Sequence, residues 1–226
     1  MAKRVLVPVI FGFVGCAVLI SLGVWQVRRL AWKEDLLAQI DARMAAAPVA
    51  VPGTPDADRD LYLPVMASGE LTGETLVVLA SLKRVGAIYR VISLLETGTR
   101  RVLVDRGYRK VGGHAGNNGS GPIAVTGNLH WPDEVDQYTP APEEKDGTLL
   151  FFARDLPAMA ERLSTEPVLI VARTVWPTDP DLTPLPVTSE IIPNDHLGYA
   201  ITWFSLAITW AGMTVFLLWR MRTRDV

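Results

Sequence analysis

Three histidines, His114, His130 and His196, are the side chains of this sequence that ordinarily titrate near neutral pH. His196 begins a stripe of residues at helical spacing, in which Tyr199 and Trp203 follow on the same face. An imidazole nitrogen is a common axial ligand of haem iron, and aromatic rings stack on flat macrocycles. The stripe is therefore a candidate site for a haem.

Trp25, Arg28 and Arg29 form a second group of this kind, at the end of an apolar stretch near the N-terminus. Guanidinium groups bind carboxylates such as the propionates of haem. We expect both groups to lie at one membrane boundary, where Asn194 or Asp195 could hold the second ring nitrogen of the histidine. The predicted haem-binding residues are Trp25, Arg28, Arg29, His196 as the axial iron ligand, Tyr199 and Trp203.

The same residues also have a simpler interpretation. Asn194, Asp195 and His196 could cap the first amides of a membrane helix and face water. Tryptophan and tyrosine are common at membrane interfaces, and Arg28 and Arg29 could bind lipid phosphates. The residues alone favour this simpler interpretation, because interfacial polar groups cost little free energy compared with those at the bilayer centre.

The sequence carries no recognisable catalytic motif. Cys16 is the single cysteine, which excludes an intrachain disulfide and a cysteine-based metal cage. There is no G-x-S-x-G elbow, no phosphate-binding glycine loop and no H-E-x-x-H pair. The formal net charge of -2 gives no indication of nucleic-acid binding. We therefore expect a protein that is not an enzyme.

The other two histidines have simple structural interpretations. His114 lies in a glycine-rich loop, where a solvated side chain is expected. His130 could pair with Asp133 or Glu134, although a polar residue at a strand end is the simpler interpretation. We expect the acidic segments around these carboxylates to be solvated loops.

Two uncharged stretches, Val5–Val24 and Leu197–Trp219, are long enough to cross a hydrocarbon core of about 30 Å. A mean hydropathy of +0.23 is ordinary for a small membrane protein. The first stretch could instead be a signal peptide or a lipoprotein leader. However, no small-x-small site precedes Trp25, and the apolar run continues beyond Cys16. The sequence therefore predicts a retained anchor.

Basic residues at both chain ends indicate the orientation. Lys3, Arg4 and the arginines between 220 and 224 flank the two apolar stretches. The positive-inside rule places such residues in the cytoplasm, although Arg28 and Arg29 argue against this assignment. We predict cytoplasmic termini and an extracytoplasmic central domain.

The central segment resembles a small α+β domain. Segments rich in Val, Ile, Leu and Tyr predict strands at 61–68, 74–81, 87–96, 100–108, 123–129 and 168–176. One helix is expected at 154–163, with Asp155 as its N-cap and Pro157 in its first turn. This order predicts a mostly antiparallel sheet.

The predicted organisation therefore has six parts. They are a first transmembrane helix with a short cytoplasmic N-terminus (1–27), a helical extension and linker (28–60), the α+β domain (61–176), a Pro-rich linker (177–195), a second transmembrane helix (196–219) and a cytoplasmic tail (220–226).

The two apolar stretches and their flanks resemble the Surfeit locus protein 1 family. The resemblance rests on "SLGVWQVRRLAWKEDLLAQI" at the first stretch and "NDHLGYAITWFSLAITW" at the second. Between them, "VLVDRGY", "ARDLPAM" and "EPVLIVA" stand where the family has similar segments. One departure is "RGYRK", where the family usually has an aromatic residue and then a Pro-containing stretch.

The resemblance implies a factor that assists assembly of cytochrome c oxidase. It implies that the chain holds haem a or helps to deliver it into subunit I, with His196 at the position implicated as haem ligand in bacterial members. The implied partners are subunit I, other assembly factors including haem a synthase, and the lipid bilayer. An apolar stretch that begins by Val5 leaves no room for a transit sequence and favours a bacterial inner membrane. The alternative is a structural adaptor that stabilises assembly intermediates without binding haem.

Overall fold

The computed structural model describes residues 2–112, 119–145 and 147–224, which fall into two compact units. The first unit combines residues 1–39 with 189–226, and the second comprises residues 40–188. His114 lies outside the described residues.

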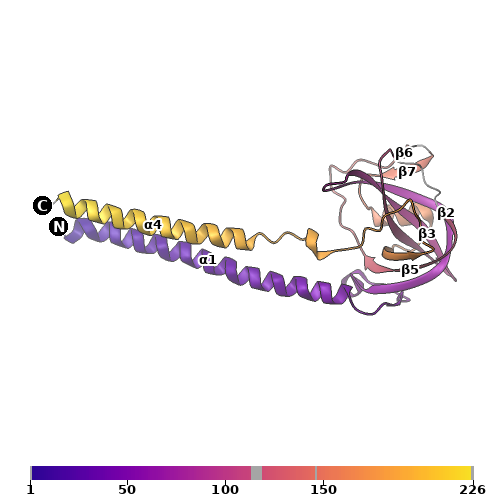
Figure 1. The fold of residues 1–226 in the computed structure, drawn as a ribbon, viewed down its shortest axis with the longest axis horizontal. Coiled ribbons are helices and arrows are strands. Elements are labelled where there is room, and N and C mark those ends of the chain that lie inside the picture. The colour runs from indigo at the N-terminus through magenta and orange to yellow at the C-terminus, as the bar shows by residue number, and fades with distance from the viewer. Residues whose placement is uncertain (1, 113–118, 146, 225–226) are drawn as a thin grey trace. The chain divides into compact units, whose positions relative to one another are not determined.

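The first unit is a pair of long helices. Helix α1 spans Ala2–Met44, and its last residues belong to the second unit, while helix α4 spans His196–Arg224 after the short 3-10 helix η1 (Ser189–Ile191). Figure 1 shows α1 and α4 side by side, with the two chain termini at the same end of the pair. Both are long and apolar enough to cross a membrane. Helix α1 continues without a break beyond the first apolar stretch, as far as Met44.

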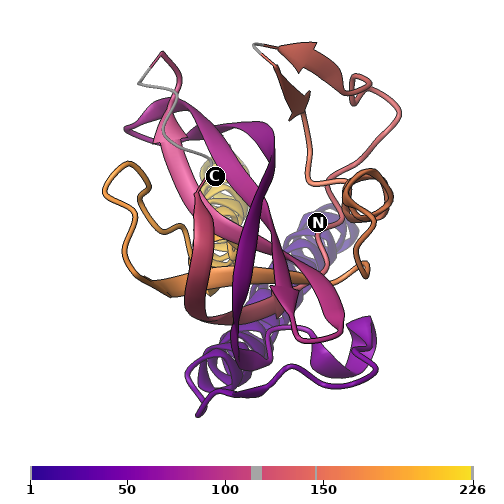
Figure 2. The same ribbon diagram turned by 90° about the vertical axis from the view of Figure 1, so that its right-hand side faces the viewer.

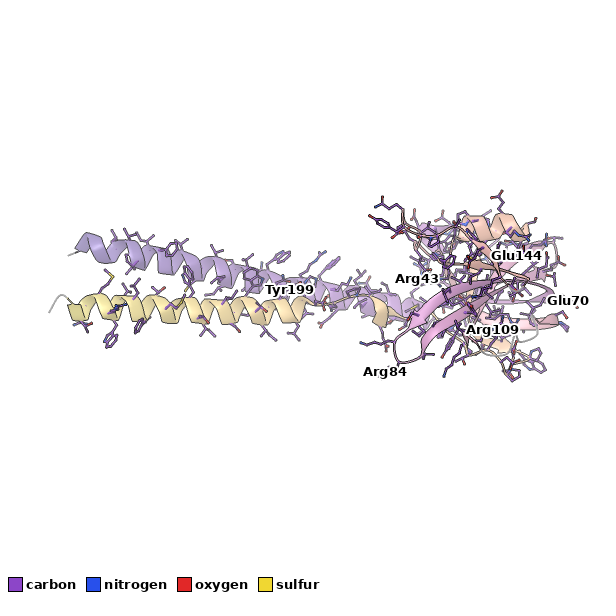
Figure 3. All side chains as sticks on the ribbon, turned by 90° about the horizontal axis from the view of Figure 1, so that it is seen from above. Arg43, Glu70, Arg84, Arg109, Glu144 and Tyr199 are labelled. Carbon is purple, nitrogen blue, oxygen red and sulfur yellow. The ribbon has the colours of Figure 1, made fainter. Side chains whose placement is uncertain are left out.

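Large apolar side chains cover the outside of this pair. Phe13 is 74% exposed and Ile208 is 75% exposed, and Figure 3 shows side chains standing out along both helices. A core helix of a soluble protein would bury such residues. The outer surface of the pair therefore suits the hydrocarbon of a bilayer.

Three glycines of α1 allow the two helices to approach closely. A Cβ atom on Gly15 would lie 2.2 Å from Nε1 of Trp210, and one on Gly23 would lie 2.7 Å from the ring of Phe204. Gly12 meets Thr214 in the same way, at 2.2 Å. Small residues at such contacts let membrane helices pack by van der Waals contact, because lipid supplies no hydrophobic force between them.

The second unit is built around a closed barrel. Its strands are β2 (Pro64–Leu82), β3 (Gly86–Thr97), β4 (Arg100–Lys110), β5 (Ser120–His130) and β8 (Leu169–Trp176). The order is β3-β4-β8-β5-β2, and β2 pairs with β3 as well as with β5, which closes the sheet on itself. Figure 2 shows these strands wrapping around a common interior. Within the barrel only β4 and β8 are parallel, so the predicted mostly antiparallel α+β domain is confirmed.

Strand β2 merges two segments that the sequence predicts as separate strands. It pairs with β5 over Pro64–Thr72 and with β3 over Glu70–Leu82, so one strand serves two sides of the barrel. Gly69 lies near the change of partner, where a Cβ atom would be 2.0 Å from the carbonyl oxygen of Glu96. A glycine is therefore required by this close backbone approach, not by the end of a strand.

Apolar residues from all five strands fill the barrel. The innermost cluster is Val65, Ala67, Leu71, Leu95, Val102, Val104, Ile123, Val125, Leu129, Val168, Ile170 and Ala172. A second cluster packs helix α3 (Leu156–Leu163) against the alternate residues of β3, β4 and β8. The predicted N-cap is confirmed, since the carboxylate of Asp155 accepts a hydrogen bond from the amide of Ala158 at 3.1 Å.

Short elements complete the second unit. They are β1 (Val49–Ala50), α2 (Ala57–Asp60), β6 (Glu143–Lys145) and β7 (Thr148–Phe151). The sequence predicts no strand in 143–151, where β6 and β7 form an antiparallel pair. Residues 177–188 belong to this unit, and Thr183 exchanges two backbone hydrogen bonds with Tyr108 of β4, at 2.8 and 2.9 Å.

Candidate cofactor site

His196 is the first residue of α4 and faces α1 within the helix pair. Its Nδ1 atom lies 2.8 Å from Oε1 of Gln26, a residue of α1 that is only 8% exposed. An amide oxygen can only accept a hydrogen bond, so Nδ1 carries the hydrogen and donates it. In a neutral imidazole the lone pair then belongs to Nε2. Nε2 has no hydrogen-bond partner among the described residues.

The polar residues before the helix do not hold the ring. The sequence predicts Asn194 or Asp195 in that place, and this prediction is wrong, because Gln26 forms the hydrogen bond to the ring. The backbone oxygen of Asp195 instead accepts a hydrogen bond from the amide of Tyr199 at 3.2 Å, as in the first turn of a helix. The side-chain oxygen of Asn194 is buried without a partner within the described part of the chain.

The other predicted haem-binding residues lie on different sides of the helix pair. Each residue advances a helix by about 100°, and α1 and α4 run in opposite directions. This geometry turns Trp25 and Arg29 of α1 toward the same flank as Tyr199 and Trp203 of α4. It points Arg28 away from α4. The structure thus brings five of the six predicted residues to one flank, with Arg28 outside the group.

The residues of this flank differ in exposure. Trp25 is 55% exposed and Tyr199, labelled in Figure 3, is 57% exposed, whereas His196 and Trp203 are partly buried. The guanidinium carbon of Arg29 lies 3.9 Å from the ring centroid of Trp32, a cation–π contact within α1. The flank therefore offers aromatic rings beside a nitrogen lone pair, with a cation toward the end of the apolar stretch.

Gln26 is the residue that the sequence interpretation missed. It follows the predicted apolar stretch directly, and its side chain has no special chemistry by itself. The spacing contains a signal for this contact. Steps of three or four residues, or sums of such steps, return to one helix face, and they connect Gly12, Gly15, Gly23 and Gln26. A glutamine on the small-residue face of a membrane helix indicates a polar contact with the partner helix.

The second unit contains a buried network of charges. The carboxylate of Asp105 is fully buried, receives a hydrogen bond from Nε of Arg90 at 2.7 Å, and lies 4.0 Å from a nitrogen of Arg154. Arg154 also forms an ion pair with Glu134. Burial raises the pKa of Asp105, and the charges of Arg90 and Arg154 oppose this shift.

The charges of Arg90 and Arg154 also act on Glu134 and His130. Burial opposes ionisation of Glu134, but the hydrogen bond and charge of Arg154 outweigh it and lower the pKa of this carboxyl. Glu134 lies exposed in a loop, as the sequence predicts, and its carboxylate is held there by the ion pair with Arg154. Burial, reinforced by the charge of Arg154, lowers the pKa of His130 to about 4. The His130 ring stacks on Tyr62, with centroids 5.8 Å apart.

A second buried arginine ties residues after β8 to the barrel. Arg106 is 5% exposed and forms an ion pair with Asp179 at 2.5 Å. Burial lowers the pKa of Arg106, and the charge of Asp179 opposes this shift. Over the described ranges of the chain, no group of His, Cys, Asp and Glu residues has the geometry of a metal site. We therefore infer that these charged networks stabilise the fold of the second unit.

Comparison with known proteins gives one consistent result. The family model described as SURF1 family matches residues 13–208. Surfeit locus protein 1 of Rattus norvegicus is 28% identical over 211 residues, which cover 82% of this chain and 67% of the rat protein. A SURF1-like protein of Monosiga brevicollis is 29% identical over 218 residues, covering 87% and 82%. Surfeit locus protein 1 of Homo sapiens is 28% identical over 215 residues, covering 83% and 69%. This chain belongs to the SURF1 family.

Proposed function

We propose that this chain is a membrane-bound assembly factor of cytochrome c oxidase that holds haem a for insertion into subunit I. Family membership supports the role in oxidase assembly. The observation that carries the haem assignment is the state of His196, whose Nδ1 is bound to Gln26 while Nε2 has no partner among the described residues. A histidine held in this way is ready to bind a metal through the second nitrogen.

The residues around His196 fit a haem. Trp25, Tyr199 and Trp203 would contact the apolar ring, and Arg29 would bind a propionate, since it is the cation of this flank and lies beyond the end of the apolar stretch. Arg28 would reach a propionate only from the other side of α1. The haem itself supplies the redox chemistry of the oxidase, and this chain is a carrier and not an enzyme.

The location follows from the same proposal. The chain resides in a bacterial inner membrane with both termini in the cytoplasm, and its barrel lies in the periplasm. Two helices suited to a membrane support the two-pass arrangement. Partners of the barrel are subunit I and other assembly factors, including haem a synthase.

An absorption spectrum tests the haem assignment. The full-length chain is purified in mild detergent from cells that make haem a and from cells that lack haem a synthase. We expect haem a bands in the first preparation alone, together with loss of mature oxidase when the chain is deleted. A haem-free protein whose deletion still blocks oxidase assembly would contradict the haem assignment.

That contrary result would point to the second candidate, a structural adaptor. One observation favours it, namely the large apolar side chains exposed on the barrel unit. Tyr138 is 81% exposed, Trp176 is 71% exposed and Met66 is 52% exposed. Exposed aromatic residues are common at protein interfaces.

A further inference from the structure

The contact between Gln26 and His196 joins α1 to α4 through two residues that are 170 positions apart in the sequence. Gln26 is 8% exposed, and its helix face is the one that packs against α4. The amide turns its Oε1 toward the ring, and in this orientation it can only accept, so the hydrogen lies on Nδ1. The contact also restricts rotation of the ring.

We propose that Gln26 is a positioning residue that sets the tautomer and orientation of His196 so that Nε2 is presented to the haem iron. This inference rests on the proposed function. Hydrogen bonds to the remote nitrogen of a histidine ligand fix its tautomer and raise its basicity, and their loss typically lowers metal affinity about 10–100-fold. Gln26 thereby couples α1 to the ligand that α4 supplies.

A different role for the same contact is simple adhesion. Polar side chains hydrogen-bond across membrane helices and contribute to their association. Adhesion alone would make the helix pairing sensitive to Gln26 but leave the electronic state of a bound ligand unchanged. The experiment therefore needs one readout on the ring itself and one on the pairing of the helices.

The first readout uses the haem-free protein. Nitrogen-15 spectra of full-length chain with labelled histidines, reconstituted in lipid nanodiscs, report which nitrogen of His196 carries the hydrogen. The His196 signals are assigned by their disappearance in His196→Asn. We expect the Nδ1–H form in the parent chain and in Gln26→Glu, which keeps an acceptor oxygen. Gln26→Leu should shift the equilibrium toward the Nε2–H form.

The second readout uses the chain loaded with haem a. Gln26→Leu should lower haem affinity about 10–100-fold and lower the iron–histidine stretching frequency, since the ligand becomes less basic. Gln26→Glu should restore the affinity. Gln39→Leu makes the same change at an exposed position of α1 and should leave both quantities unaltered.

Helix pairing is measured in parallel. The Sγ atom of Cys16 lies 3.8 Å from the carbonyl oxygen of Ala207, so Ala207→Cys should form a disulfide with it. Equal cross-linking with and without Gln26→Leu is expected, which would show that the ring and not the pairing has changed. A loss of cross-linking that accounts for the whole fall in affinity would overturn the positioning role.

The failures of the two proposals can be told apart. A parent chain that holds no haem a would overturn the proposed function, whatever the tautomer of His196. A parent chain that holds haem a would overturn only the role of Gln26 if Gln26→Leu left the tautomer, the affinity and the stretching frequency unchanged.

Discussion

His130 and His196 have different surroundings. His196 has one nitrogen bonded to a buried amide and the other without a partner in the described structure. His130 stacks on Tyr62 near the charge of Arg154, and its Nδ1 is buried without a partner within the described residues. The first arrangement suits a ligand, whereas the second keeps a neutral ring inside the barrel unit.

The lowered pKa of His130 predicts how stability depends on pH. The unfolded chain binds a proton there near pH 6.5, but the folded chain binds it only near pH 4. The free energy of unfolding should therefore fall as the pH decreases from about 6.5 to about 4, by an amount on the order of 2–3 kcal/mol. His130→Phe keeps an aromatic ring beside Tyr62 and should flatten this pH dependence in thermal unfolding. Equal slopes for the parent and the variant would contradict the assignment.

The burial of Asp105 predicts that its arginine partner contributes more to the free energy of unfolding than an arginine paired at the surface. Arg90→Met removes a partner that is 2.7 Å from a fully buried carboxylate and should lower the free energy of unfolding by about 3–5 kcal/mol. Arg101→Met is the control, because Arg101 pairs with Glu74 and Glu96 at the surface. Its effect should stay below about 1 kcal/mol in the same denaturant titration. Similar losses for the two variants would disprove the distinction.

At the scale of elements, the sequence predicted what local patterns encode. The two apolar stretches became α1 and α4, and Asp155 with Pro157 marked the start of α3, because length, hydropathy and capping are local properties. The closure of the barrel was not predictable, since it depends on β2 pairing with two partners at once. Gly69 illustrates the difficulty, because a glycine required by close backbone approach resembles a strand end in the sequence.

The candidate site was predictable in part, because local patterns are visible in the sequence whereas contacts between distant elements are not. Aromatic and basic residues near His196 are visible as a pattern within each stretch. The contact with Gln26 is not, because it depends on which faces of α1 and α4 meet.

The glycine contacts of α1 predict a direct effect on helix pairing. A side chain at position 15 would strike the ring of Trp210, with the Cβ atom 2.2 Å from Nε1. Gly15→Val should therefore reduce the cross-link between Cys16 and Ala207→Cys severalfold. Gly212→Val adds the same side chain at a position in α4 with nothing within 4 Å of its Cβ, and should not reduce it. Equal yields would show that the two helices do not pack through this face.

At the scale of the whole molecule, one membrane helix precedes the barrel unit in the sequence and another follows it. The barrel unit, residues 40–188, contains 14 Lys and Arg against 19 Asp and Glu, whereas basic residues follow α4 at the C-terminal end. This distribution agrees with cytoplasmic termini, because positively charged flanks are retained there while long domains cross largely regardless of charge.

Reporter insertions test this topology. Gly98 lies in the turn between β3 and β4, where an added Cβ meets nothing within 4 Å, so an insertion there should be tolerated. A reporter that is active only outside the cytoplasm should work at Gly98 and fail at the C-terminus, and a cytoplasmic reporter should give the reverse. Activity of one reporter at both positions would rule out the two-pass arrangement.

The central claim is that His196 binds the iron of haem a, and its most direct test is the haem content and Soret position of purified His196→Ala. The account predicts a fall in haem per protein of at least about tenfold, with a shifted Soret band for any haem that remains and normal insertion of the protein. His130→Phe, which removes a histidine of the barrel unit, should retain the parent spectrum. A His196→Ala protein with the haem content and Soret position of the parent would contradict the account and leave His196 as a polar residue that joins two helices.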